Sequence, residues 1–287
     1  MTRVIAVDWS GKAKGAAESI WRAVVIDGHL VELENGLDRA EITEWIVEYA
    51  QRHPRTVVGL DFAFSFPAWF CERGGWGSGR DVWDSMRVRA DELLDTCEPP
   101  FWGRAETKAQ KLGHAFRQTE LDVEGQPKSV FQIGGAGAVG TGSLRGMRHL
   151  AQLAEAGFAI WPFDEPGWPL VAEIYPRLLT PKGLVKSRHL ERRAHLTQTF
   201  PDQNQVLLER AAGSEDAFDA AISALTMAQH LDELENPTRL TWTRWSPTTA
   251  RSCSKRSSSD GDRGAFRRAR APDTSRCRRR RPLPVHQ

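Results

Sequence analysis

The sequence predicts a mixed α/β fold, in which helices cover both faces of a single β-sheet. Apolar runs at residues 4–7, 19–26 and 29–33 are typical of strands, and the dipeptide Asp27–Gly28 predicts a tight hairpin between the last two. A helical pattern then separates this antiparallel trio from another apolar run that ends on Asp61. Strands and helices continue to alternate after it, which is typical of crossover connections.

The helices are predicted from capping residues and from apolar spacing. Asp38 and Glu41 form a capping-box pattern ahead of apolar residues at positions 42, 45, 46 and 49, which share one helical face. Apolar residues three apart, at positions 144, 147, 150 and 153, predict a second helix after a glycine-rich loop. Two short strands follow at 158–162 and 170–174, then a basic segment at 177–200 that is helical in its second half. Ser214 is the predicted cap of the last helix.

The chain divides near residue 237 into a globular body and a basic segment. Residues 1–237 hold the predicted sheet and helices, with a loop-rich insertion at about 69–130 in which 87–96 is helical. Residues 238–287 carry 14 Lys and Arg against 3 Asp and Glu, and we expect them to be disordered. Two interpretations stay open: a basic arm that grips nucleic acid, and a reading-frame shift, which the abrupt change in composition near Leu240 favours.

Composition is typical of a cytoplasmic globular protein. A hydrophobic content of 40% and 11 tryptophans indicate a packed core. No run of 18 apolar residues occurs, so no membrane span is expected, and Asp8 interrupts any signal-peptide core. The four cysteines form no CxxC pair, which argues against a disulfide framework or a zinc site.

Carboxylates occupy positions where an α/β sheet binds ligands. Asp8 and Asp61 each follow the end of a predicted strand, and the carboxyl ends of strands border the ligand site in such sheets. Asp216 and Asp219 are three apart, which places them on one side of the last helix. Taken singly, an Asp after a strand is more often a turn former, and an acid in a first helical turn favours the helix dipole. Glu173, near the end of a later strand, is a further candidate.

Four converging carboxylates repel one another unless cations lie between them. Mg²⁺ or Mn²⁺ takes oxygen ligands of this kind, and two such ions can clamp a phosphodiester for hydrolysis. The constellation therefore predicts a divalent-metal site held by Asp8, Asp61 and Asp219, with Asp216 or Glu173 assisting.

Several motifs resemble the DUF429 family, whose members are described as nucleases with an RNase H-like fold. The likeness covers residues 3–237 and rests on five segments: "VDWSG", "VGLDFAFSFP", "FQIGGAGAVGTGSLRGM", "AEIYPRLL" and "EDAFDAAISAL". More distantly, the layout is similar to RuvC-type Holliday-junction resolvases, which place acids on the first and fourth strands and two acids three apart on the last helix. Asp8, Asp61, Asp216 and Asp219 would fill these positions in order. The second acid is commonly Glu in those enzymes and is Asp here, while Glu173 has no counterpart and is either an additional ligand or a structural acid.

The glycine-rich loop at 134–146 is a candidate phosphate-binding segment. Backbone amides at a helix N-terminus bind anions, and Gly135, Gly137, Gly140, Ser143 and Arg145 would form such a site. The lysine of a P-loop is absent. A turn that needs glycine for positive φ explains the segment equally well.

Three functions are therefore considered. The first is a Mg²⁺- or Mn²⁺-dependent nuclease acting on DNA or RNA, against which the net charge of −9 in residues 1–237 counts. The second is a nucleotide-phosphate ATPase or phosphotransferase on the same framework, against which the length of a single domain counts. The third is a binding protein without catalysis that keeps its acids for structure.

Overall fold

The computed structural model describes residues 1–104, 115–123 and 127–235. The basic segment at 238–287 and the predictions made for it lie outside these ranges. Within them, no helix is long and apolar enough to cross a membrane.

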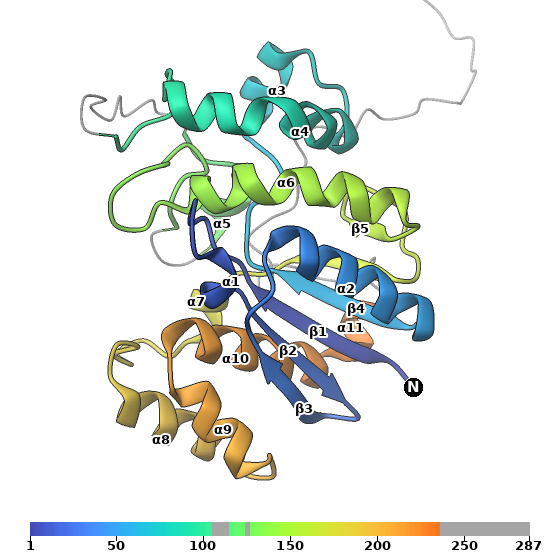
Figure 1. Cartoon of the computed structure of the whole chain (residues 1–287), viewed down its shortest axis with the longest axis vertical. Helices are drawn as coiled ribbons and strands as arrows, with labels where there is room; N and C mark the ends of the chain where they lie inside the picture. The colour runs from blue at the N-terminus through green and yellow to red at the C-terminus, as the bar shows by residue number, and fades with distance from the viewer. Residues whose placement is uncertain (105–114, 124–126, 236–287) are drawn as a thin grey trace, which may run out of the picture. The chain divides into compact units, whose positions relative to one another are not determined.

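A six-stranded mixed sheet forms the centre of the fold (Figure 1). The strands lie in the order β3-β2-β1-β4-β6-β5. Their bounds are β1 (Arg3–Asp8), β2 (Trp21–Ile26), β3 (His29–Glu34), β4 (Thr56–Leu60), β5 (Ala159–Trp161) and β6 (Leu170–Glu173). The trio β1, β2 and β3 is antiparallel, whereas β1, β4, β6 and β5 run parallel to their neighbours. The predicted mixed α/β class is confirmed.

Helices cover both faces of this sheet. On one face lie α2 (Arg39–Arg52) and α6 (Val139–Glu155), and α4 (Gly79–Thr96) packs against α6 as an outer layer. On the other face lie α8 (His189–Thr199), α9 (Gln205–Ala212) and α10 (Glu215–Gln229). Figure 1 shows α2 and α6 on the opposite side of the strands from α9 and α10. The shorter helices are α1 (Ala16–Ser19), α3 (Ala68–Gly74), α5 (Gln118–Asp122), α7 (Pro176–Leu179) and α11 (Leu231–Glu235).

The predicted caps are confirmed in detail. The Asp38 carboxylate accepts hydrogen bonds from the amides of Ala40 and Glu41, at 2.8 and 3.0 Å, and the Glu41 side chain accepts one from the Asp38 amide. Ser214 Oγ accepts from the Ala217 amide at 3.0 Å, which starts α10 where the sequence predicted. These caps satisfy amides that have no partner inside the helix.

Two segments differ from the expected pattern. The second strand begins at Trp21 rather than at residue 19, because Gly15 adopts a left-handed conformation (φ 65°) that starts the short helix α1. The segment at 69–130 contains the 18-residue helix α4, of which the sequence predicted only the C-terminal half, 87–96. Its N-terminal turn is specified instead by a cap, Ser78 Oγ accepting from the Asp81 amide at 3.2 Å.

Candidate active site

The strand register places Asp8 and Asp61 side by side. Val7 of β1 pairs with Leu60 of β4, and the Asp61 amide donates to the Val7 carbonyl at 3.1 Å. Residues on alternate sides of β1 enter different cores: Ile5 and Val7 face α2 and α6, whereas Val4 and Ala6 face α10. Asp8 continues the second series, so strand alternation directs its side chain toward α10.

Helix α10 brings Asp219 to the same edge. A Cβ added to Gly59 of β4 would lie 2.6 Å from Met227 Sδ, so α10 crosses the sheet at a point where only a glycine leaves room. Asp219 is buried, and Asp216, one turn earlier, is half-buried. The two residues therefore lie on the α10 face of the sheet, near the end of β1.

Asp8 and Asp219 are buried, Asp61 is partly exposed, and the electrostatics of Asp8 and Asp61 depend on the other aspartates. Burial, followed by the charges of Asp61, Asp219 and Asp216, raises the pKa of Asp8 well above its usual range. Burial and Asp219 likewise raise the pKa of Asp61 well above its usual range. Repulsion among these carboxylates is relieved when a cation lies between them.

Lys186 supplies the positive charge at this cluster. Its ammonium forms an ion pair with Asp219 Oδ2, and both side chains are largely buried, with exposed fractions of 16% and 12%. Burial raises the pKa of Asp219 to about 6, and the ammonium of Lys186 opposes that rise. The backbone of Lys186 is fixed in turn by the buried Arg192, which donates to the Lys186 carbonyl and to the Ala212 carbonyl.

The donor chemistry of the cluster fits a divalent cation. Among the described residues no three Asp, Glu, His or Cys side chains form a ready-made metal group, and Asp219 is paired with Lys186 instead. However, Asp219 Oδ1 is buried and has no hydrogen-bond partner, which is costly for a carboxylate oxygen. The surrounding donors are carboxylate oxygens, the ligands that Mg²⁺ and Mn²⁺ prefer. Displacement of the Lys186 ammonium would free the second oxygen of Asp219 as well.

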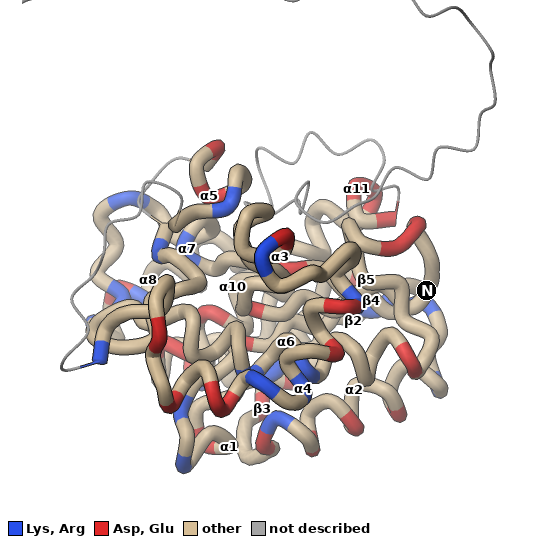
Figure 2. The backbone as a smooth tube through the Cα atoms, turned by 90° about the horizontal axis from the view of Figure 1, so that it is seen from above, with Lys and Arg blue, Asp and Glu red and all other residues tan. Residues whose placement is uncertain are grey.

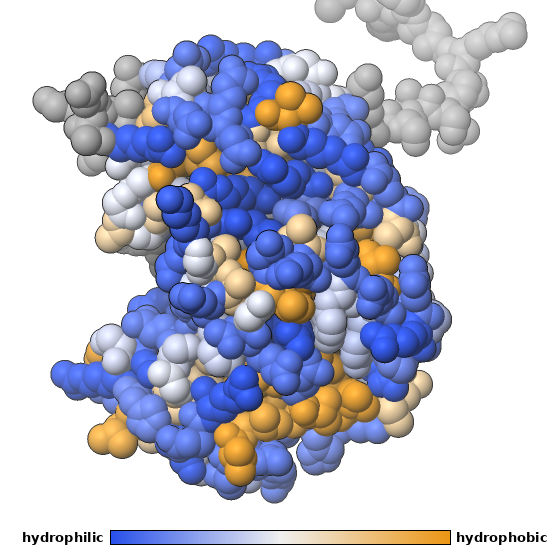
Figure 3. Space-filling model, viewed as in Figure 1, coloured by the Kyte–Doolittle hydropathy of each residue, from blue (hydrophilic) through white to orange (hydrophobic). Residues whose placement is uncertain are grey.

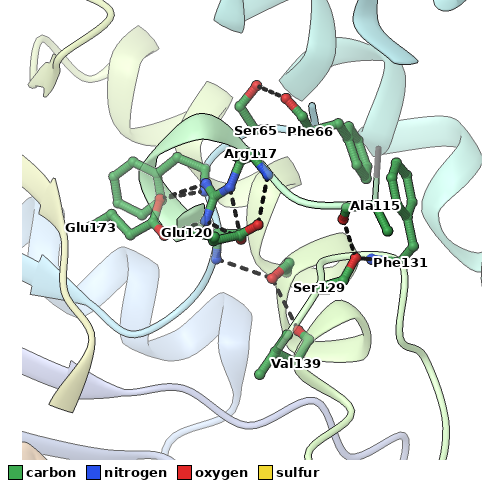
Figure 4. Close-up of polar contacts among 12 residues, drawn as sticks. Ser65, Phe66, Ala115, Arg117, Glu120, Ser129, Phe131, Val139 and Glu173 are labelled. Carbon is green, nitrogen blue, oxygen red and sulfur yellow. Dashed lines mark hydrogen bonds and ion pairs between the residues drawn. The ribbon is translucent and has the colours of Figure 1, made fainter. Parts of the chain in front are cut away.

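Glu173 belongs to a separate, buried ion network (Figure 4). Arg117 donates to both of its carboxylate oxygens, at 2.9 and 3.1 Å, and the Phe64 amide donates to one of them at 3.0 Å. Glu120 accepts from Arg117 Nε at 3.0 Å and from the Arg117 amide at 2.8 Å. Burial raises the pKa of Glu173, and Arg117 opposes this. We therefore expect Glu173 to hold the segment after Asp61 in place rather than to bind metal.

A small cavity of about 170 Å³ opens beside Asp61. The Arg117–Glu173 pair forms part of its wall, together with aromatic side chains of Trp9, Phe62 and Tyr175. This volume is below the roughly 300 to 1,000 Å³ of pockets that enclose whole small ligands. The cavity accommodates only a fragment of a larger substrate.

The predicted phosphate loop has internal roles for most of its residues. Gly135 and Gly137 have φ values of 77° and 76°, which favour glycine for conformational reasons. Gly140 packs on the Val130 carbonyl, where a Cβ would lie 2.1 Å from the oxygen. The Ser143 hydroxyl accepts from the Ala63 amide and donates to the Val139 carbonyl, both at 3.0 Å. Arg145 donates to the Gly11 carbonyl.

Several residues of the site had no sequence signal. Lys186 and Arg192 lie in a basic segment in which no spacing singles them out, and Arg117 lies in the loop-rich insertion, where no periodicity marks it. Their importance follows from burial next to carboxylates, which depends on the tertiary fold. Comparisons with family models, with curated proteins and with solved structures find no match. The function is therefore inferred from the chemistry of these residues.

Proposed function

We propose that this protein is a divalent-metal-dependent nuclease that hydrolyses phosphodiester bonds. The observation that carries the proposal is the meeting of Asp8, Asp61 and Asp219, from two parallel strand ends and one helix, around a buried carboxylate oxygen without a partner. The sequence resemblance to the DUF429 family and to RuvC-type resolvases supports it, since those layouts place acids at the same elements. The antiparallel trio joined to parallel strands agrees with an RNase H-like sheet.

Each carboxylate has a distinct role in this proposal. Mg²⁺ or Mn²⁺ would be held by Asp8, Asp61 and Asp219. Asp216 is half-buried and would add negative charge at the edge of this cluster. A bound ion of this kind lowers the pKa of an attacking water and stabilises charge on the phosphate oxygens. Glu173 and Arg117 orient the backbone that follows Asp61.

Lys186 has a role before metal binds. Its ammonium keeps Asp219 in the charged form that a cation requires, and its release from Asp219 accompanies metal binding. The bond from Arg192 to the Lys186 carbonyl would keep this lysine beside the carboxylates after that release.

The size of the cavity bears on the alternative of a nucleotide enzyme. An ATPase or phosphotransferase would enclose a whole nucleotide, whereas the cavity beside Asp61 holds only about 170 Å³. A polymeric substrate that inserts only part of one nucleotide, such as its base, and leaves the rest outside agrees better with this volume. The third alternative is a protein that binds without catalysis. It would use the same site and would differ only in cleaving nothing.

The proposal is tested by incubating the full chain with Mg²⁺ or Mn²⁺ and four substrates: single-stranded DNA, duplex DNA, RNA and ATP. Asp8→Asn and Asp219→Asn are the test variants, and Asp84→Asn, an exposed residue of α4, is the matched control. We expect cleavage of at least one nucleic acid, a loss of roughly 100-fold or more in both test variants, and an unchanged control. Hydrolysis of ATP alone would favour the nucleotide enzyme. Equal cleavage by wild type and Asp8→Asn would contradict the proposal.

A further inference from the structure

Three arginines surround a groove on the α2 and α6 side of the sheet. Arg39 lies in the first turn of α2, and Arg145 and Arg148 lie one turn apart on α6. Together with Asp38 and Asp91 they line a hollow of about 370 Å³. Figure 2 shows basic segments beside α4 and α6, and Figure 3 shows that the face over α2 and α6 is mostly hydrophilic.

The positive charge in this groove exceeds what its two acids neutralise. The Asp38 carboxylate is occupied by the amides that it caps, and Asp91 forms an ion pair with Arg148 at 2.9 Å, which leaves three arginines against two aspartates. Burial, followed by repulsion from Arg145 and Arg148, lowers the pKa of Arg39, so the other two guanidinium groups disfavour its charge. Arg148 Nε is buried and has no hydrogen-bond partner. An anion between these side chains would relieve the repulsion and satisfy that donor.

The groove is joined to the carboxylate cluster through one turn of backbone. Arg39 Nε donates to the Ser10 carbonyl at 3.1 Å, and the same side chain also donates to the Lys12 carbonyl. Arg145 donates to the Gly11 carbonyl between them. This turn directly follows Asp8, so the arginines hold the segment that positions the first metal-binding carboxylate.

We propose that Arg39, Arg145 and Arg148 form a subsite for a backbone phosphate of the nucleic-acid strand whose scissile bond lies at Asp8. Guanidinium groups match the oxygens of a phosphate through paired N–H donors, which ammonium groups cannot do. The site makes no contact that distinguishes bases, so it would fix the position of the strand without selecting sequence. This inference rests on the proposed nuclease function for the identity of the ligand.

The groove also gives the acidic body a local basic footprint. Residues 1–237 carry a net charge of −9, which disfavours contact with nucleic acid over the surface as a whole. The three arginines lie beside the turn that follows Asp8, so they would attract a strand to this part of an otherwise acidic surface.

Binding is tested with the full chain by fluorescence anisotropy of a labelled single-stranded oligonucleotide in EDTA, where no cleavage takes place. Arg148→Gln is the main variant because Arg148 bonds only a side chain, whereas Arg39 and Arg145 also hold backbone carbonyls. Arg148→Lys keeps the charge without the paired donors, and Arg73→Gln, an exposed residue of α3, is the matched control. The basic segment after 237 is present in every variant and cancels in the comparison.

We expect Arg148→Gln to weaken binding about fivefold to tenfold and to reduce the slope of log K against log salt by about 0.7, the value for one lost phosphate contact on a single strand. Arg148→Lys restores the slope but not the full affinity, and Arg73→Gln behaves as wild type. Equal affinity and slope in Arg148→Gln and wild type would overturn the subsite.

Further measurements distinguish a nucleic-acid strand from free phosphate as the ligand, and the subsite from the nuclease proposal. Competition by inorganic phosphate or by a mononucleotide as effective as the oligonucleotide, at equal phosphate concentration, would overturn the assignment to a strand. Loss of binding in Arg148→Gln without any metal-dependent cleavage by wild type would support the subsite and contradict the nuclease. Cleavage by wild type with an unchanged KM in Arg148→Gln would support the nuclease and contradict the subsite.

Discussion

His149 gives a direct test of the packing behind the Asp8 turn. It lies on α6, with Nδ1 3.1 Å from Thr43 Oγ1 and its ring at an edge-on angle to Trp9, the residue after Asp8. Burial, followed by the nearby charge of Arg148, lowers the pKa of His149 from 6.5 to about 4. The folded protein therefore holds a neutral imidazole at pH values where an unfolded chain would protonate it.

The size of the effect follows from this difference in pKa. Because the pKa is lower in the folded state, the stabilisation is complete above pH 6.5 and is lost as the pH falls from 6.5 toward 4. A difference of about 2.5 pKa units corresponds to roughly 3 kcal/mol of unfolding free energy over that range. His149→Asn, whose amide replaces the Nδ1 contact with Thr43, cannot be protonated and should lack this loss.

Urea unfolding of wild type and His149→Asn, at about pH 7.5 and about pH 4, measures how much unfolding free energy each protein loses as the pH falls. Between these pH values we expect the unfolding free energy of wild type to fall by about 3 kcal/mol more than that of His149→Asn. Carboxylates titrate in both proteins, so their contribution cancels in the difference. His29→Asn, at an exposed histidine, should follow wild type. Parallel pH profiles for wild type and His149→Asn would refute the account of a buried neutral histidine.

Three further predictions concern the site and its supports. Arg117→Met leaves two buried glutamates without their cation and should cost about 3 to 5 kcal/mol in urea unfolding; a cost below about 1 kcal/mol would contradict the buried network. Gly59→Ala places a Cβ against Met227 Sδ and Ile174 Cγ2, at 2.6 and 2.7 Å, and should cost about 1 to 3 kcal/mol in urea unfolding; a cost below about 0.5 kcal/mol would show that these side chains do not limit this position. Lys186→Met should raise the affinity for Mn²⁺ about tenfold in calorimetry, because the ion no longer has to displace an ammonium. Lys182→Met, at an exposed lysine, is the control and should bind Mn²⁺ as wild type does. Weaker Mn²⁺ binding in Lys186→Met would indicate that the lysine supports the ion rather than competing with it.

The strands and their carboxylates were accessible from sequence because they depend on local patterns. Apolar runs that end on Asp8 and Asp61 marked the two strand ends, and spacing of three placed Asp216 and Asp219 on one side of α10. The register that brings Asp8 beside Asp61 follows once β1 and β4 are parallel neighbours. Periodicity and capping therefore predicted the strands and helices that carry the four aspartates, whereas metal binding by these residues stays a prediction.

Residues that act through long-range contacts were not accessible in the same way. Lys186 reaches Asp219 across 33 residues and Arg117 reaches Glu173 across 56, and neither spacing has a local pattern. The charge run around Lys186 resembles any solvated helix face in sequence. Which of its members is buried is decided by how α8 and α9 pack beneath the sheet.

Calorimetric titration of Mn²⁺ into the full chain tests the central claim most directly, with wild type beside Asp8→Asn, Asp219→Asn and the exposed control Asp84→Asn. If Asp8 and Asp219 share one metal site, wild type and Asp84→Asn bind Mn²⁺ alike, and both test variants lose at least about tenfold in affinity. Equal binding by all four proteins, or no binding by wild type, would contradict a shared metal at the ends of β1, β4 and α10.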